Sequence, residues 1–365
     1  NYPSNKNIPF GAKKVWRVDN ARLNIVLDVA ETHFAGNTWS KINIGHLPSL
    51  CFKRNTKGLI NEKLKENVVD GTSFETTGNR YPENEDRVQC RKNMEDHIIG
   101  SNKINSSQIY PHNIISGTNP SSLEKKAMMA QWRSLLELTH ANMEKVKEQI
   151  IGESTDVERA ISSGNIIGCC DTSASMTWVG TYPERPYDIA VALTAFISEL
   201  SNESWRDIAM SFSTSPSILN FENMNVFERV EHLSRNSGGS TNYMALHKEL
   251  LRLCILRSIN QEDLPVLLVL SDGHFDQQCS LYDGYSYYYG GGINKTMGNA
   301  TTHDNIIKLW TDAGYDAPPT VVYWNLAADK SSVQASSSMP GVQLLSGASP
   351  SNFKYILYGE LAETV

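Results

Sequence analysis

The chain has 365 residues, of which 40% are hydrophobic and 20% charged, and its formal net charge at pH 7 is −7. This composition is that of a globular protein, and the length predicts two domains or one large domain with an extension. No apolar stretch approaches the roughly 20 residues that cross a bilayer, and no charged start followed by an apolar run marks a secretory signal, so we expect a soluble protein without a membrane partner.

Residues 1–151 are predicted to form a mainly helical, loop-rich segment. A helical piece is expected at residues 20–30, whereas residues 68–124 are rich in Asn, Gly, Ser and Pro and are expected to form loops. A long helix is predicted from Ser122, a suitable N-cap. Its apolar residues recur at the spacing of one buried helical face, at Met128, Trp132, Leu135, Met143, Val146 and Ile150.

The first part of the chain is basic and the remainder is acidic. Residues 1–150 carry 21 Lys and Arg against 16 Asp and Glu, and residues 151–365 carry 12 against 24. Two solvated surfaces of unequal composition explain this difference, and so does an amino-terminal part that meets a polyanion. The sequence leaves both interpretations open.

Residues 152–164 have the composition of a linker, and strands alternate with helices in the domain that follows at residues 164–365. Strands are predicted at 165–170, 208–212, 218–221, 265–270 and 320–326, and helices at 188–200, 243–257, 302–313 and 351–361. This alternation predicts an α/β fold, namely a doubly wound, mostly parallel sheet with helices on both faces.

Polar side chains stand next to three of these predicted elements. Asp171, Ser173 and Ser175 directly follow the first strand, Thr241 precedes a helix, and Asp272 follows the apolar run "PVLLVL". Because open α/β sheets bind ligands at the carboxyl ends of their strands, these residues are candidates for one site at that edge.

In this order and context, the D-x-S-x-S motif, the threonine and the second aspartate resemble the metal-ion-dependent adhesion site of von Willebrand factor A domains. The resemblance extends over residues 164–365 and implies the Rossmann-like fold of those domains. It also implies a divalent cation, Mg²⁺ or else Mn²⁺ or Ca²⁺, at the carboxyl edge of the sheet.

The same resemblance assigns roles to the individual residues. The hydroxyls of Ser173, Ser175 and Thr241 would bind the ion directly, with Ser240 as an alternative to Thr241. Asp171 and Asp272 would act mainly through water or as outer acceptors.

A site built from oxygen atoms alone suits a hard cation, and the lack of His and Cys in it argues against zinc. A metal ion held by neutral hydroxyls keeps a net positive charge, so an open coordination position would accept a carboxylate or phosphate oxygen of a partner. The alternative is a fold of this kind whose site is empty or only stabilises the loops.

A second resemblance rests on the segments "WSKINIGHLPSL", "SSQIYPHNII", "AQW", "DAGYDAPPTVVYWNL" and "GVQLLSGASPSNFKYIL". They are similar to a domain-of-unknown-function family related to the Ro autoantigen. In Ro-type proteins a helical-repeat TROVE module is joined to a von Willebrand A domain and binds RNA. The resemblance therefore implies that residues 1–151 are the tail of such a module and that the chain acts in a ribonucleoprotein. No helical repeat is recognisable in residues 1–150, which departs from the pattern.

A tyrosine-rich insertion follows the loop that carries Asp272. Tyr285, Tyr287, Tyr288 and Tyr289 lie close together between glycines. This composition is typical of contact surfaces, because the ring provides a large area at a low entropic cost, and such rings also stack on nucleic-acid bases. The insertion is therefore a candidate partner-binding surface or, alternatively, a loose surface loop.

The sequence contains no G-x-S-x-G elbow, P-loop or H-E-x-x-H motif, and Asp171 lacks the second aspartate of phosphoaspartyl phosphatases. His274 and Asp276 are the residues near the predicted metal that would act as a base in a hydrolytic enzyme. We expect instead a non-catalytic binding protein without a small-molecule substrate. Its partner would be RNA or a protein that presents an acidic group.

The six cysteines show neither a C-x-x-C pair nor the spacing of a zinc site. Cys169 and Cys170 lie in the first apolar strand, and we expect the cysteines to be reduced in an intracellular, cytoplasmic protein. N-x-S/T sequons that point the other way begin at Asn105, Asn202, Asn294 and Asn299. Such triplets arise by chance in a chain rich in Asn, Ser and Thr.

Overall fold

The computed structural model describes residues 10–69, 72–100, 103–116, 120–149, 160–161, 163–212, 216–235, 243–272, 302–327, 341–348 and 350–358. The chain divides into two compact units, one formed by Asn1–Ile109 and Gly117–Leu135 and the other by Tyr110–Ser116 and Leu136–Val365. In the described ranges, no helix combines the length and the apolar character that a bilayer span requires.

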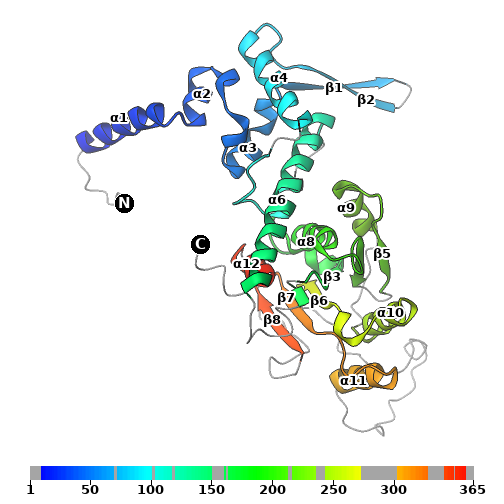
Figure 1. Cartoon of the computed structure of the whole chain (residues 1–365). Helices are drawn as coiled ribbons and strands as arrows, with labels where there is room; N and C mark the ends of the chain where they lie inside the picture. The colour runs from blue at the N-terminus through cyan, green and yellow to red at the C-terminus, as the bar shows by residue number, and fades with distance from the viewer. Residues whose placement is uncertain are drawn as a thin grey trace. The chain divides into compact units, whose positions relative to one another are not determined.

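The first unit contains helices and one hairpin (Figure 1). Its helices are α1 (Phe10–Val26), α2 (Ala30–Gly36), α3 (Ser49–Leu59), α4 (Glu85–Ile99) and the beginning of α6 (Ser122–Gln149), with short 3-10 turns at Trp39–Lys41 and Ile44–His46. A buried apolar cluster joins α3, α4 and the beginning of α6, and it includes Phe52 and Leu59 of α3, Cys90 and Met94 of α4 and Ala127 of α6.

The hairpin consists of β1 (Glu62–Val69) and β2 (Thr72–Asn79), which pair antiparallel from Glu62 opposite Asn79 to Val69 opposite Thr72. The loops expected at residues 68–124 are wrong for β2 and for α4, since composition rich in Asn, Gly and Ser outweighs in that expectation the strand-favouring Thr and Phe residues of β2. The two strands are separated in sequence by Asp70 and Gly71, a dipeptide that is a strong hairpin signal.

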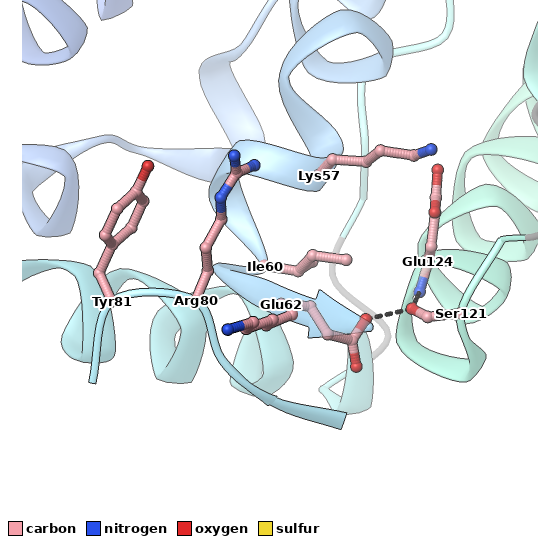
Figure 2. Close-up of a pocket in the computed structure, with 8 residues that line it drawn as sticks. Lys57, Ile60, Glu62, Arg80, Tyr81, Ser121 and Glu124 are labelled. Carbon is pink, nitrogen blue, oxygen red and sulfur yellow. Dashed lines mark hydrogen bonds between the residues drawn. The ribbon is translucent and has the colours of Figure 1, made fainter. Parts of the chain in front are cut away.

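The start of α6 is fixed by Ser121, one residue before the N-cap predicted from the sequence. The Ser121 hydroxyl oxygen accepts the backbone N–H of Glu124 at 3.1 Å, which satisfies one of the donors at the helix start. The same hydroxyl donates to the carboxylate of Glu62 at the beginning of β1 (Figure 2). The helix itself, predicted from Ser122, is confirmed.

The second unit contains a six-stranded sheet in the order β5-β4-β3-β6-β7-β8. The strands are β3 (Ile166–Asp171), β4 (Ile208–Phe212), β5 (Ile218–Asn220), β6 (Val266–Ser271), β7 (Val321–Asn325) and β8 (Val342–Ser346). All neighbours pair parallel except β4 and β5. The structure therefore confirms the predicted mostly parallel α/β fold.

Helices cover both faces of this sheet. The helices of this unit are α5 (Pro111–Ile115), α8 (Pro186–Leu200), α9 (Val226–Arg235), α10 (Tyr243–Leu256), α11 (Thr302–Asp312) and α12 (Pro350–Tyr358), and 3-10 turns occur at Ala174–Thr177 and Gln261–Asp263. On one face, Ile167 and Cys169 of β3 pack in a buried cluster with residues of α10 and α11. On the other, a Cβ at Gly168 would lie 3.3 Å from the Cα of Thr194, so glycine permits the close approach of α8.

The described cysteines agree with the prediction of reduced thiols. Cys51, Cys90, Cys169, Cys170 and Cys254 all have free thiols, and all but Cys51 are buried. Burial raises the pKa of Cys90 to about 11, so this thiol is protonated at neutral pH. The sixth cysteine lies outside the described residues.

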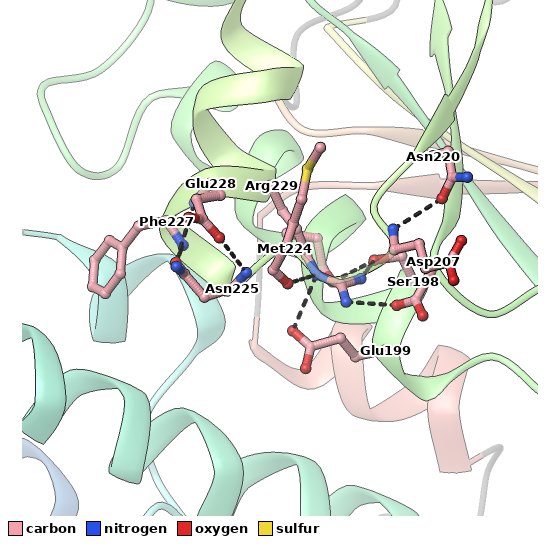
Figure 3. Close-up of polar contacts among 11 residues, drawn as sticks. Ser198, Glu199, Asp207, Asn220, Met224, Asn225, Phe227, Glu228 and Arg229 are labelled. Atoms are coloured by element: carbon pink, nitrogen blue, oxygen red, sulfur yellow. Dashed lines mark hydrogen bonds and ion pairs between the residues drawn. The ribbon is translucent and has the colours of Figure 1, made fainter.

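Arg229 of α9 ties three segments of the second unit together (Figure 3). Its guanidinium donates to Asp207 Oδ1 at 2.5 Å, to Ser198 Oγ of α8 at 2.8 Å and to the Met224 carbonyl at 3.0 Å, and it lies 3.8 Å from Glu199. The arginine is buried, so its charge is compensated by partners rather than by water.

We expect the Arg229→Met variant to lower the free energy of unfolding by about 3 kcal/mol, because Asp207 and Ser198 would lose their buried donor. Urea denaturation followed by circular dichroism measures this change. Arg235→Met is the matched control, because Arg235 pairs with Glu231 on the surface of the same helix and exposed pairs contribute little. Equal stability of the two variants would contradict the role assigned to Arg229.

Candidate functional site

The ends of β3 and β6 form the point at which the strand order of the sheet reverses. β3 and β6 are parallel neighbours with Cys170 opposite Leu270, so Asp171 and Ser271 follow at the same level. The next strand after β3 in sequence, β4, lies on the far side of β3, and β7 lies on the far side of β6. Open α/β sheets bind ligands at such a switch point, outside the carboxyl ends of the strands.

The carboxylate of Asp171 bridges the two strand ends. Its Oδ1 accepts the backbone N–H of Ser173 at 2.9 Å, within its own loop. Its Oδ2 accepts the hydroxyl of Ser271, at the end of β6, at 2.6 Å. Asp171 is completely buried, so these two donors take the place of water around a charged group.

Two hydroxyls of the same loop lie side by side. Ser173 Oγ and Ser175 Oγ are 3.0 Å apart, at the start of the 3-10 turn Ala174–Thr177. Ser173 is buried and Ser175 is half-buried, so the pair reaches from the end of β3 toward the surface. The arrangement presents two neutral oxygens beside a buried carboxylate.

Burial raises the pKa of Asp171, and the nearby carboxylate of Asp272 adds to this effect. The hydrogen bonds from Ser271 and Ser173 act in the opposite direction. Asp272, directly after β6, is also buried. Two buried carboxylates that repel each other are stabilised by a nearby cation.

The donor set fits a hard cation that binds through hydroxyls and water. No group of three or more His, Cys, Asp or Glu side chains able to hold a metal occurs in the parts of the chain that the structure describes. Both oxygens of Asp171 already accept protein donors, so this residue suits an outer position, while the Ser173 and Ser175 hydroxyls suit direct bonds.

The structure brings together part of the site predicted from the sequence. Asp171, Ser173 and Ser175 share one loop, and Asp272 is close enough to influence Asp171. The remaining predicted residues lie outside the described residues, namely Ser240, Thr241, His274, Asp276, Tyr285, Tyr287, Tyr288 and Tyr289.

Ser271 is a site residue that the sequence motif does not include, and it donates the shorter of the two hydrogen bonds to Asp171. The sequence feature that points to Ser271 is its position as the last residue of an apolar strand, directly before Asp272. The structure also exposes apolar side chains shortly after the hydroxyl pair in the sequence. Trp178 is 78% exposed, and Val179 and Tyr182 follow it on the surface.

Comparisons with known proteins add a family match. The model of a family described as Domain of unknown function (DUF7788) matches residues 165–364. Uncharacterized protein L728 of Acanthamoeba polyphaga mimivirus is 23% identical over 343 residues, which cover 93% of this chain and 51% of that protein. The crystal structure of the Deinococcus radiodurans RO (RSR) protein matches with a TM-score of 0.41 and 12% identity, over 85% of this chain and 52% of the other. The chain thus spans about half the length of both proteins.

We expect Ser271→Ala to destabilise the second unit by about 1 to 3 kcal/mol, because a buried oxygen of Asp171 would lose its donor. Thermal and urea unfolding measure the change. Thr311→Ala is the matched control, because the hydroxyl of this exposed threonine donates only to carbonyls of its own helix. A Ser271→Ala variant as stable as the control would show that the hydrogen bond to Asp171 contributes nothing.

Proposed function

This chain belongs to the family described as Domain of unknown function (DUF7788), and we propose that its second unit is a metal-dependent binding module of the von Willebrand A type. In this proposal the carboxyl edge of the sheet holds Mg²⁺ or a similar divalent cation. The ion presents an open coordination position to an acidic group of a partner. The module binds and performs no catalytic step.

One observation carries the proposal, namely the buried carboxylate of Asp171 beside two adjacent hydroxyls at the switch point of the sheet. Ser173 and Ser175 would hold the cation directly, and Ser271 keeps Asp171 oriented toward them. Direct ligands without charge leave the ion with net positive charge, and this charge attracts a carboxylate or phosphate oxygen.

The proposed site is completed by residues from two further loops. Thr241, or Ser240 beside it, would contribute another hydroxyl, and Asp272 would accept hydrogen bonds from water on the ion. These roles come from the resemblance to the metal-ion-dependent adhesion site and extend the arrangement around Asp171.

A protein with an exposed carboxylate is the partner that the site supports best. Trp178, Val179 and Tyr182 are exposed side chains that follow Ser175 within a few residues of the sequence. Aromatic side chains in such positions often supply most of the binding energy around a central polar contact. The four tyrosines of the insertion are proposed to add to this contact surface, namely Tyr285, Tyr287, Tyr288 and Tyr289.

RNA is the second candidate partner, favoured by the excess of Lys and Arg in residues 1–150. A basic surface attracts phosphates, and the acidic remainder of the chain repels them. In that case the chain would act in a Ro-like ribonucleoprotein, as the similarity of its sequence segments to Ro-related proteins implies.

Calorimetric titration of Mg²⁺ into the chelator-treated full chain should reveal one saturable site. We expect Asp171→Asn to weaken Mg²⁺ binding by about 10- to 100-fold, as is usual for residues that orient the direct ligands of a metal. Ser175→Ala should also weaken it, and this half-buried position tolerates the change without unfolding.

Asp312→Ala is the control for the titration, because it removes an exposed carboxylate from the end of α11. This variant should bind Mg²⁺ as the wild type does. Absence of a saturable site in the wild type, or unchanged affinity in both site variants, would refute the metal proposal.

The nature of the partner determines how its complex responds to chelator and to salt. Partners retained from the native source by the immobilised full chain should elute with EDTA at constant ionic strength if a metal ion bridges them. An RNA partner should instead elute as salt rises from about 50 to 200 mM, because phosphate contacts release counterions. Elution by salt alone, with RNA in the eluate, would show that the partner is RNA and not a protein.

A further inference from the structure

The first unit contains a cavity of about 590 Å³ that the metal proposal does not use. It lies where the end of α3, the base of the β1–β2 hairpin and the start of α6 meet. The charged and aromatic side chains that line it are Lys57, Glu62, Lys63, Arg80, Tyr81 and Glu124 (Figure 2). This volume lies within the range of small-molecule binding sites.

Three cations line the cavity, and Lys57 is close enough to Glu124 to influence its carboxyl group. Lys57, Lys63 and Arg80 are exposed, and none of them lies within 4.0 Å of a described carboxylate. Arg80 is placed beside the ring of Tyr81, 5.7 Å from its centroid. Exposed cations on one cavity wall that form no ion pair favour a bound anion.

The opposite side of the cavity offers hydrogen-bond acceptors. Figure 2 shows Glu62, Ser121 and Glu124 together, away from Arg80 and Tyr81. The Glu62 side chain is only 4% exposed, and it accepts the Ser121 hydroxyl and lies 3.8 Å from Arg91.

Glu124 is buried, yet no described residue donates a hydrogen bond to its carboxylate. Burial raises its pKa, while Lys57 and Lys53 act in the opposite direction. Burial also lowers the pKa of Lys53 to about 8. Ionisable groups with displaced pKa values are common at binding and catalytic sites, and Glu124 lines this cavity.

We propose that this cavity binds a phosphate ester of a sugar. The phosphate would lie against Lys57, Lys63 and Arg80, which supply the positive charge that a dianion requires. The sugar hydroxyls would donate to the carboxylates of Glu62 and Glu124, and the half-exposed ring of Tyr81 would cover the ligand. The same chemistry occurs in a free sugar phosphate and in a nucleotide.

Ribose 5-phosphate is the probe that contains both required groups. Calorimetric titration into the full chain at fixed ionic strength should show saturable binding. Lys57→Ala combined with Arg80→Ala should weaken it about tenfold or more, because two charged hydrogen bonds to phosphate are removed. Glu124→Gln should weaken ribose 5-phosphate several-fold but leave binding of inorganic phosphate unchanged.

The double variant Lys41→Ala/Lys92→Ala is the matched control, because it removes two exposed cations of the same unit that do not line the cavity. Circular dichroism confirms that each variant is folded. AMP in a parallel titration shows which kind of ligand the cavity prefers. Tighter binding of AMP than of ribose 5-phosphate indicates a nucleotide, and equal binding indicates a sugar phosphate. No saturable binding by about 10 mM of either probe, or equal weakening in the control, would overturn the proposal.

Discussion

The second unit depends on one constraint, which is that the charge of Asp171 is buried at the junction of its two central strands. A carboxylate in this position is tolerated only because β3 and β6 end at the same level and because each strand end supplies a donor, from Ser173 and from Ser271. The parallel register therefore creates the polar site, and the site in turn fixes the two strand ends. A ligand bound there would lie at the ends of both strands.

The sequence predicts strands correctly where their residues are buried without interruption. The apolar runs of β3, β6 and β7 are buried throughout, so their length and their polar ends were readable without a structure. The sequence does not predict β8, an edge strand without a fully buried residue, or the hairpin, whose strands contain few apolar residues. Patterns of hydrophobicity predict a strand poorly where few of its residues are apolar or fully buried.

The candidate site was partly predictable for a related reason. Asp171, Ser173 and Ser175 form a recognisable local motif, whereas Ser271 reaches Asp171 only through strand pairing across 100 residues of sequence. The cavity of the first unit was not predictable at all. Lys57, Arg80 and Glu124 belong to no sequence motif. They line one cavity only because three separate elements meet there in the fold.

The central claim is that the hydroxyls beside Asp171 hold a divalent cation, and diffraction tests it most directly. Crystals of the full chain grown with Mn²⁺ and measured at the manganese absorption edge locate the ion without reference to any assay. The account predicts an anomalous peak about 2.1 Å from the Ser173 and Ser175 hydroxyl oxygens, with Asp171 linked through water. A peak elsewhere, or no peak at this loop at saturating Mn²⁺, would contradict it.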